Sequence, residues 1–271
     1  MPAFSVIVGT YDRPELLREA LGSIEAQTCD DFECLVIDDG SHTAAAVMPT
    51  DPRFHLIELE ANVGATEVRN IGIAAATGDA LAFLDDDDLW LPHRLALAAT
   101  GLAVAPIAIC GSRFMEATKM KRFPVLEGDV HHQIVDQFTP GLGRTAIERQ
   151  AFLPFDPRFA ACEDVDWGLR ETVEHRVWST KEVAQLTRRH DGARHGNGAP
   201  ARIVGSELLL EVHAAYYGSH PKARAFRQYR LGVLNLSCGH RTEGRTWLRR
   251  SLRSRPSLRA GRRLAESLAG R

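Results

Sequence analysis

Short apolar runs alternate with helical patterns over residues 1–90. Runs of this kind, without polar alternation, are typical of strands buried inside a parallel sheet. The predicted strands are Phe4–Val8, Phe32–Asp38, His55–Glu58 and Ala80–Leu84. Helical patterns separate them, one opened by Pro14 at a first turn and one over residues 65–76. This alternation predicts an α/β fold with a mixed, mainly parallel sheet flanked by helices.

The pattern changes in the second half of the chain. Residues 101–160 mix glycine, proline and short apolar runs, and a helix is predicted from Glu163 through Val173. Residues 188–200 are rich in arginine, histidine and glycine and predict a loop. From Ala201 onward leucine and alanine recur at helical spacing. We therefore expect a domain over 1–200, followed by an Arg-rich helical cap over 201–271.

Part of that cap resembles a single tetratricopeptide helix pair. The residues that carry the resemblance are Gly232, Gly244, Ser251, Leu252 and Pro256. A lone repeat of this kind cannot stack on copies of itself. We therefore expect the pair to pack as a cap on the main domain.

Polar clusters follow three of the predicted strands: Thr10-Tyr11-Asp12, Asp38-Asp39 and Asp85–Asp88. Ligands of α/β sheets bind outside the carboxyl ends of the strands, so we expect these clusters to meet. Four adjacent aspartates raise one another's pKa unless a cation neutralises them, and carboxylate oxygens suit Mg²⁺ or Mn²⁺. The alternative is a solvated acidic turn. In either case we expect Asp88 to cap a helix after it.

Composition places the chain among ordinary globular proteins, with 44% hydrophobic and 25% charged residues. No apolar run approaches the length that spans a bilayer, and the amino terminus reads as a strand, not a signal peptide. The five cysteines form no CxxC motif. These features lead us to expect a cytoplasmic protein with reduced thiols.

Charge is unevenly distributed along the chain. Residues 1–100 hold 18 acidic and 5 basic side chains, whereas residues 241–271 hold ten arginines against two glutamates. This contrast predicts two functional regions. The arginines alternate with leucines at helical spacing, which favours a cap with a solvated face over nucleic-acid binding. Two questions are left open: whether this basic region contacts the inner membrane face, and whether the chain forms a homodimer.

Several motifs, in this order, resemble the family 2 glycosyltransferases of the GT-A fold. They are Ser5–Leu17, Val36–Ser41, Asn62–Ala65, Arg69–Gly72, Gly78-Asp79, Phe83–Asp88 and Glu163-Asp164. The departures are small: Gly9 replaces a more usual proline or small polar residue, and His42 follows Ser41.

The resemblance implies a Rossmann-like GT-A domain with a nucleotide-sugar-binding half over 1–100 and an acceptor-binding half over 101–200. It implies an inverting enzyme that uses Mn²⁺ or Mg²⁺ and a nucleotide-sugar donor, UDP-linked by preference. The acceptor hydroxyl is left open among a glycan, a lipid-linked and a small-molecule acceptor. Two rival functions are a nucleotidyltransferase and an inactive nucleotide-sugar-binding protein. The former would need a glycine-rich basic loop after the first strand, which residues 9–12 do not provide.

The resemblance also implies roles for individual residues. Those expected to bind the nucleotide sugar are Thr10, Tyr11, Arg13, Asp39, Arg69, Asp85 and Asp86. Those expected to hold the metal are Asp87, Asp85 and His190. Tyr11 would offer its ring to the base, and Arg69 would reach the diphosphate through its permanently charged donors.

Glu163 and Asp164 resemble the family's catalytic pair. Asp164 is expected to act as general base on the acceptor hydroxyl. Trp167, on the same predicted helix, is expected to border the acceptor. The alternative for the acidic pair is a purely structural one, since carboxylates are stabilised at helix N-termini.

Overall fold

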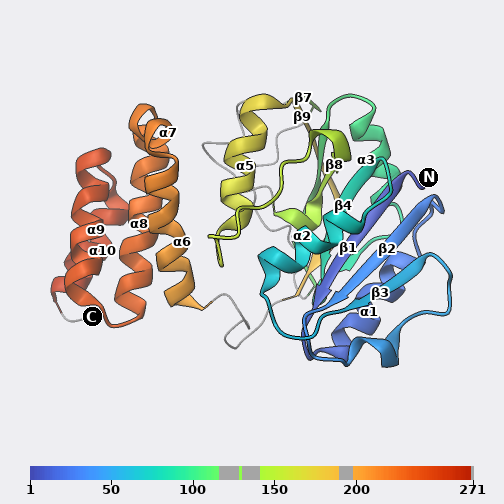
Figure 1. Cartoon of the computed structure of the whole chain (residues 1–271). Helices are drawn as coiled ribbons and strands as arrows, with labels where there is room; N and C mark the ends of the chain where they lie inside the picture. Colours follow the sequence, from blue (N-terminus) through green and yellow to red (C-terminus); the bar gives the residue numbers. More distant parts are fainter. Residues whose placement is uncertain (116–127, 130–140, 189–197, 270–271) are drawn as a thin grey trace. The chain divides into compact units, whose positions relative to one another are not determined.

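The computed structural model describes residues 1–115, 128–129, 141–188 and 198–269. The chain divides into two compact units (Figure 1). The first comprises Met1–Pro157 and Trp167–Asp191, and the second comprises Arg158–Asp166 and Gly192–Arg271. Among the described residues, no helix is long and apolar enough to cross a membrane.

The first unit is built on one mixed sheet. Its described strands are β1 (Phe4–Thr10), β2 (Phe32–Asp38), β3 (Phe54–Glu58), β4 (Ala80–Asp85), β5 (Leu89–Trp90), β6 (Ile107–Phe114), β7 (Gly128–Asp129), β8 (Thr145–Glu148) and β9 (Val177–Thr187). Their order is β3-β2-β1-β4-β8-β6-β9-β5, with β7 paired to β9. The first four are mutually parallel, and β8 runs antiparallel between β4 and β6.

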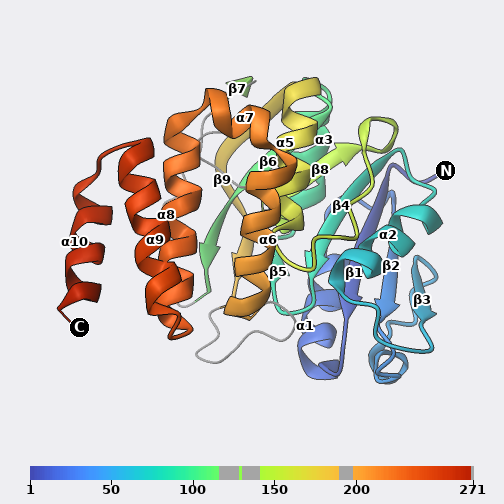
Figure 2. The ribbon, with the colours of Figure 1, turned by 60° about the vertical axis from the view of Figure 1, so that its left-hand side comes forward.

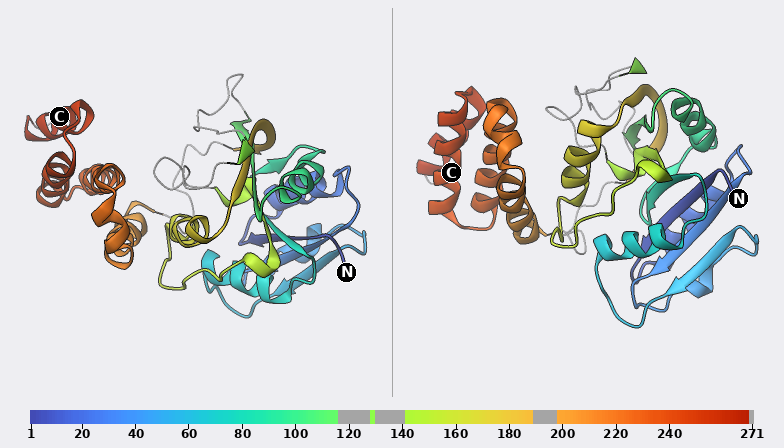
Figure 3. Two further views of the ribbon diagram at one scale, coloured as in Figure 1. Left: turned by 90° about the horizontal axis from the view of Figure 1, so that it is seen from above. Right: turned by 45° about the horizontal axis from the view of Figure 1, so that its top comes forward.

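Helices cover both faces of this sheet (Figure 3). They are α1 (Pro14–Glu25), α2 (Ala65–Ala75), α3 (Arg94–Leu102) and α5 (Glu163–Glu174), with short 3-10 turns at η1 (Ala44–Val47), η2 (Leu142–Arg144) and η3 (Arg149–Ala151). Side chains alternate across β1: Val6 and Val8 pack with α1 and α3, whereas Ile7 packs with Val68 of α2. The sheet therefore has a hydrophobic core on each face.

The second unit is helical. Its helices are α6 (Ala199–Val212), α7 (Ala214–Ser219), α8 (Pro221–Ser237), α9 (Arg241–Ser254) and α10 (Leu258–Leu268). Within this unit α8 lies between α6 and α9, and α10 packs on the far side of α9 (Figure 2). Leu209, Leu231, Leu248 and Ala260 are buried at these helix contacts.

The predicted α/β fold with a mainly parallel sheet and carboxy-terminal helices is confirmed. The strand predicted over Phe32–Asp38 has those bounds in the structure, and the strand expected over Phe4–Val8 extends to Thr10. The helix pair expected around Gly232 and Gly244 is present as α8 and α9. The division of the chain at residue 200 stays a prediction.

Candidate active site

The predicted polar clusters meet at the carboxyl edge of the sheet. β1 lies between β2 and β4, and all three run in the same direction. Thr10 of β1 pairs with Asp38 of β2, and Gly9 of β1 pairs with Asp85 of β4. The chain therefore leaves all three strands at the same level, which places the segments after them side by side.

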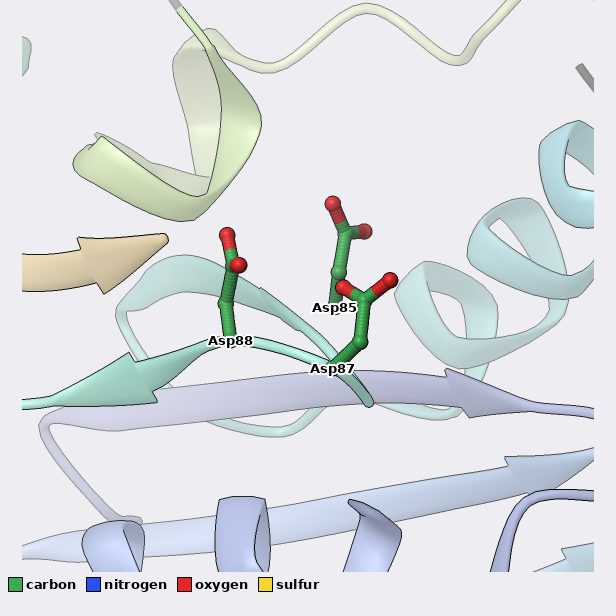
Figure 4. A group of neighbouring side chains, drawn as sticks. All are labelled: Asp85, Asp87 and Asp88. Carbon is green, nitrogen blue, oxygen red and sulfur yellow. The ribbon is translucent and has the colours of Figure 1, made fainter. Parts of the chain in front are cut away.

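Asp85, Asp87 and Asp88 form a group that could hold a metal ion (Figure 4). One carboxylate oxygen from each lies within 4.8 Å of the others. A tight turn produces this grouping, because the Asp88 N–H donates to the Asp85 carbonyl at 3.0 Å and folds the chain back. Three hard oxygen donors on a short loop match the ligand preference of Mg²⁺ and Mn²⁺.

Asp88 is the buried member of this group. Its carboxylate accepts hydrogen bonds from the Gln185 side chain at 2.6 Å and from the Arg188 N–H at 3.0 Å. Burial, followed by the negative charge of Asp85, raises the pKa of Asp88 to about 7 despite these bonds. A buried carboxyl crowded by two others is stabilised as an anion by a bound cation. The side chains present therefore fit a divalent metal.

The expectation that Asp88 caps a following helix is wrong. The next element is the strand β5, and the next helix, α3, begins only at Arg94. Asp88 is held instead by β9, through Gln185 and the backbone that follows Thr187. No local pattern indicates this pairing, because about a hundred residues separate the partners along the chain.

Asp86 points away from the three-carboxylate group toward the end of β1. It accepts from the Thr10 hydroxyl at 2.8 Å and from Arg13 Nη1 at 3.3 Å. Arg13 also reaches Asp87 Oδ2 at 3.3 Å, so one guanidinium joins the two carboxylates. Burial raises the pKa of Asp86 to about 6, opposed by Thr10 and Arg13.

Arg69 brings a second guanidinium to the group. It projects from α2, and its Nη2 donates to Asp85 Oδ1 at 3.0 Å. The family resemblance implies that Arg69 reaches a diphosphate, and its ion pair with Asp85 lies beside the three-carboxylate group. Together with Arg13 it provides fixed positive charge suited to phosphate oxygens.

Asp38, the last residue of β2, and Asp39, the next residue, have different roles. Asp38 accepts four hydrogen bonds from the turn after it: from the Ser41 N–H and hydroxyl and from the N–H groups of Thr43 and Ala44. Although burial opposes them, these bonds hold the pKa of Asp38 below its ordinary value. Asp38 is thus a turn former.

Asp39 holds a neighbouring loop. Its carboxylate accepts from the Val63 N–H at 2.6 Å and from the Gly64 N–H at 3.1 Å. Gly64 has φ of +89°, a conformation that favours glycine and aims its N–H at Asp39. A carboxylate has about four acceptor positions, so Asp39 retains capacity for a ligand. Its role toward a nucleotide stays a prediction.

Tyr11 and His190 are the remaining residues of the predicted donor and metal site. Tyr11, at the end of β1, is 45% exposed, which leaves its ring accessible to a stacking partner. His190, the third predicted metal ligand, lies outside the described residues. No sequence pattern indicates a role for Arg188, two residues before it. Its Nε donates to the Asp87 carbonyl at 3.3 Å, and its guanidinium pairs with Glu19.

Glu163 and Asp164 occupy the first turn of α5 and belong to the second unit. The segment that carries them is fixed to the helices of that unit. Asp166 Oδ1 lies 2.8 Å from His213 Nε2, and Cys162 Sγ lies 3.7 Å from the Ser206 hydroxyl. The helical extension thus supports the predicted catalytic pair.

The expectation that Trp167 borders an acceptor is wrong. Trp167 has no exposed surface, and its ring stacks on Phe152 at 5.6 Å between centroids and lies 6.2 Å from Phe155. It belongs to the core between α5 and the sheet. An aromatic residue one helical turn from an acidic pair is as consistent with a core position as with a binding surface. The complete burial of Trp167 shows that it occupies a core position.

Comparisons with known proteins agree on one class of enzyme. Residues 5–145 match the family described as Glycosyl transferase family 2. The whole chain is 26% identical to the putative colanic acid biosynthesis glycosyl transferase WcaA of Escherichia coli (strain K12) and covers 99% of it.

Solved structures share the GT-A fold. S. aureus TarS 1–349, crystallised with UDP-GlcNAc, matches with a TM-score of 0.64 at 15% identity, over 99% of this chain and 92% of that one. The mannosyltransferase PcManGT from Pyrobaculum calidifontis, in complex with GDP-Man and Mn²⁺, matches with a TM-score of 0.63 at 20% identity, over 99% and 80%.

Proposed function

The chain belongs to glycosyl transferase family 2, and from that premise we propose that it transfers a sugar from a UDP-sugar to an acceptor hydroxyl with inversion, assisted by Mn²⁺ or Mg²⁺. One observation carries the proposal. Asp85, Asp87 and Asp88 converge at the carboxyl edge of the sheet, beside the ends of β1 and β2. That edge is where α/β sheets bind their ligands.

The donor side is supported by charge and by relatives. Arg13 and Arg69 flank the carboxylates, so positive groups stand ready for a diphosphate beside the residues that would hold a cation. Among the solved relatives, TarS binds UDP-GlcNAc and UDP, and PcManGT binds GDP-Man with Mn²⁺. We assign Thr10, Tyr11 and Asp39 to the nucleoside, and the choice of UDP is part of the proposal.

A divalent cation held by Asp85, Asp87 and Asp88 would neutralise the charge that develops on the departing nucleoside diphosphate. Asp164 takes the proton of the acceptor hydroxyl. The acceptor oxygen forms a bond to the anomeric carbon, and the bond from that carbon to the diphosphate oxygen breaks, with its electron pair leaving on the diphosphate. Attack opposite the leaving group inverts the anomeric carbon. Glu163 and Asp164 both lie in the first turn of α5.

Calorimetric titration of UDP and of a panel of sugar nucleotides tests the proposal. We expect binding of UDP-sugars to need Mn²⁺ or Mg²⁺ and to weaken at least tenfold in Asp87→Asn, because one ligand is lost. Asp79→Asn is the matched control, since exposed Asp79 precedes β4 at the opposite end of the strand. Equal binding in EDTA and in Asp87→Asn would contradict the proposed metal site.

A further inference from the structure

The second unit contains a group of arginines for which the described residues provide no acidic partner. Arg202 comes from α6, and Arg227 and Arg230 come from α8, which packs against α6 (Figure 2). Arg227 is only 9% exposed, and its buried Nε has no hydrogen-bond partner. Among the residues that the structure describes, none of these three arginines forms an ion pair. We call these three residues the arginine cluster.

The members of the cluster repel one another. Desolvation by the surrounding helices, followed by the positive charges of Arg227 and Arg202, lowers the pKa of Arg230. Arg259, at the start of α10, adds to this repulsion and is held by Tyr229, whose hydroxyl accepts from its Nε at 3.0 Å. Arg230 itself is exposed, whereas burying the Arg227 guanidinium without a counter-charge is costly, and a bound anion would offset that cost.

The segment with the predicted catalytic pair packs against the same helices. A Cβ on Gly205 of α6 would lie 2.1 Å from the Ala161 carbonyl oxygen, so the backbone of this segment rests directly on α6. Burial raises the pKa of the Cys162 thiol, and the positive charge of Arg227 opposes this rise. Cys162 immediately precedes Glu163. The cluster and the predicted base are therefore mounted on one unit.

We propose that Arg202, Arg227 and Arg230 bind a phosphate or diphosphate group carried by the acceptor. This inference rests on the proposed function, in which Asp164 of the same unit takes the acceptor's proton. The donor's diphosphate has its own arginines, Arg13 and Arg69, in the first unit. Three guanidiniums match the two or three negative charges of a phosphoryl group better than the single charge of a carboxylate.

Titration of the full-length protein with inorganic phosphate, inorganic pyrophosphate and phosphatidylglycerol vesicles tests the inference. We expect pyrophosphate to bind in EDTA, and to bind about tenfold or more weakly in Arg230→Gln, the loss expected for one charge-assisted hydrogen bond. Arg227→Met keeps an unbranched apolar stem at the buried position, removes the guanidinium and should have the same effect. Circular dichroism identifies a variant that fails to fold. If Arg227→Met does not fold, Arg230→Gln still tests the inference, because Arg230 is exposed. Arg249→Gln, on the exposed face of α9, is the matched control and should bind as the wild type.

The variants separate this inference from the proposed function. Pyrophosphate binding that survives in Asp87→Asn and fails in Arg230→Gln supports the arginine cluster, whether or not a UDP-sugar binds. Binding that requires Mn²⁺ and fails in Asp87→Asn places the anion at the donor site and overturns the inference, while the proposed function stands. Binding to the vesicles without binding of pyrophosphate overturns the inference and indicates a diffuse basic surface. Pyrophosphate binding that the cluster variants leave unchanged overturns it in the same way.

Discussion

At the scale of the residue, four adjacent aspartates have four different surroundings. Asp85 is exposed and paired with Arg69, and Asp87 is paired with Arg13. Asp86 contacts Thr10, and Asp88 is buried against β9. The turn from Asp85 to Asp88 creates these differences. It folds the chain back, so that the first and last of the four aspartates lie close together. Carboxyl groups of one chemistry can therefore serve as a ligand group and as an internal support within one turn.

Asp164→Asn tests the proposed base. We expect donor binding with Mn²⁺ to be unchanged and sugar transfer to fall by roughly 10²–10⁴, because the amide cannot accept the acceptor's proton. Titration of the donor and single-turnover transfer measure the two effects. Transfer at the normal rate would refute the assignment of Asp164.

Glu171 on α5 predicts a pH dependence of stability. Its side chain is fully buried, Oε1 accepts from the Leu153 N–H at 2.6 Å, and Oε2 lies 3.6 Å from His175 Nε2. Burial raises the pKa of Glu171 to about 7 from 4.5. The folded state therefore holds a proton that the unfolded state releases between these values, so stability falls as pH rises through this window.

Glu171→Gln should remove that dependence. Relative to the variant, the wild type should lose up to about 3 kcal/mol of unfolding free energy between pH 4.5 and 7. Urea unfolding of both proteins across this range measures the difference, which cancels the parallel titration of Asp86 and Asp88. A constant difference at every pH would show that Glu171 keeps an ordinary pKa.

At the scale of the element, two glycines allow α8 and α9 to approach closely. A Cβ on Gly244 would lie 2.7 Å from Leu236 Cγ and 3.0 Å from the Gly232 carbonyl oxygen. A Cβ on Gly232 would meet Leu248 Cγ at 2.7 Å. Each helix thus accepts a leucine of the other at its glycine, which explains the spacing that resembles a tetratricopeptide pair.

Gly244→Ala should destabilise the second unit by about 1–3 kcal/mol, because the new methyl group overpacks this contact. Gly261→Ala is the matched control on α10, where no atom lies within 4 Å of the added Cβ. Its better helix propensity should raise stability by up to about 1 kcal/mol. Thermal unfolding followed by circular dichroism should give shifts of opposite sign, and equal shifts would disprove the close contact.

At the scale of the whole molecule, the two proposed halves of the reaction belong to different units. The proposed metal ligands, Arg13 and Arg69 belong to the first, and Glu163, Asp164 and the arginine cluster belong to the second. Each unit has buried side chains of its own. The acidic and basic ends of the sequence correspond to this division.

Separate cores predict that the two activities fail at different temperatures. In Gly244→Ala, transfer should be lost on warming before UDP binding with Mn²⁺ is lost, because the weakened unit carries Asp164 and not the aspartate group. Parallel measurement of donor binding and transfer across the thermal transition checks this. Simultaneous loss of both would indicate a single cooperative unit.

The sequence by itself determined the parallel core, the meeting of polar strand ends and the family, because each depends on local pattern and on the order of elements. The second unit's helix pair was also visible in the positions of its glycines. Three features required the tertiary structure: Asp88 held by Gln185, Trp167 in the core, and an arginine cluster assembled from α6 and α8. Each depends on contacts between segments far apart along the chain, and those contacts depend on how helices and strands pack, which local periodicity does not encode.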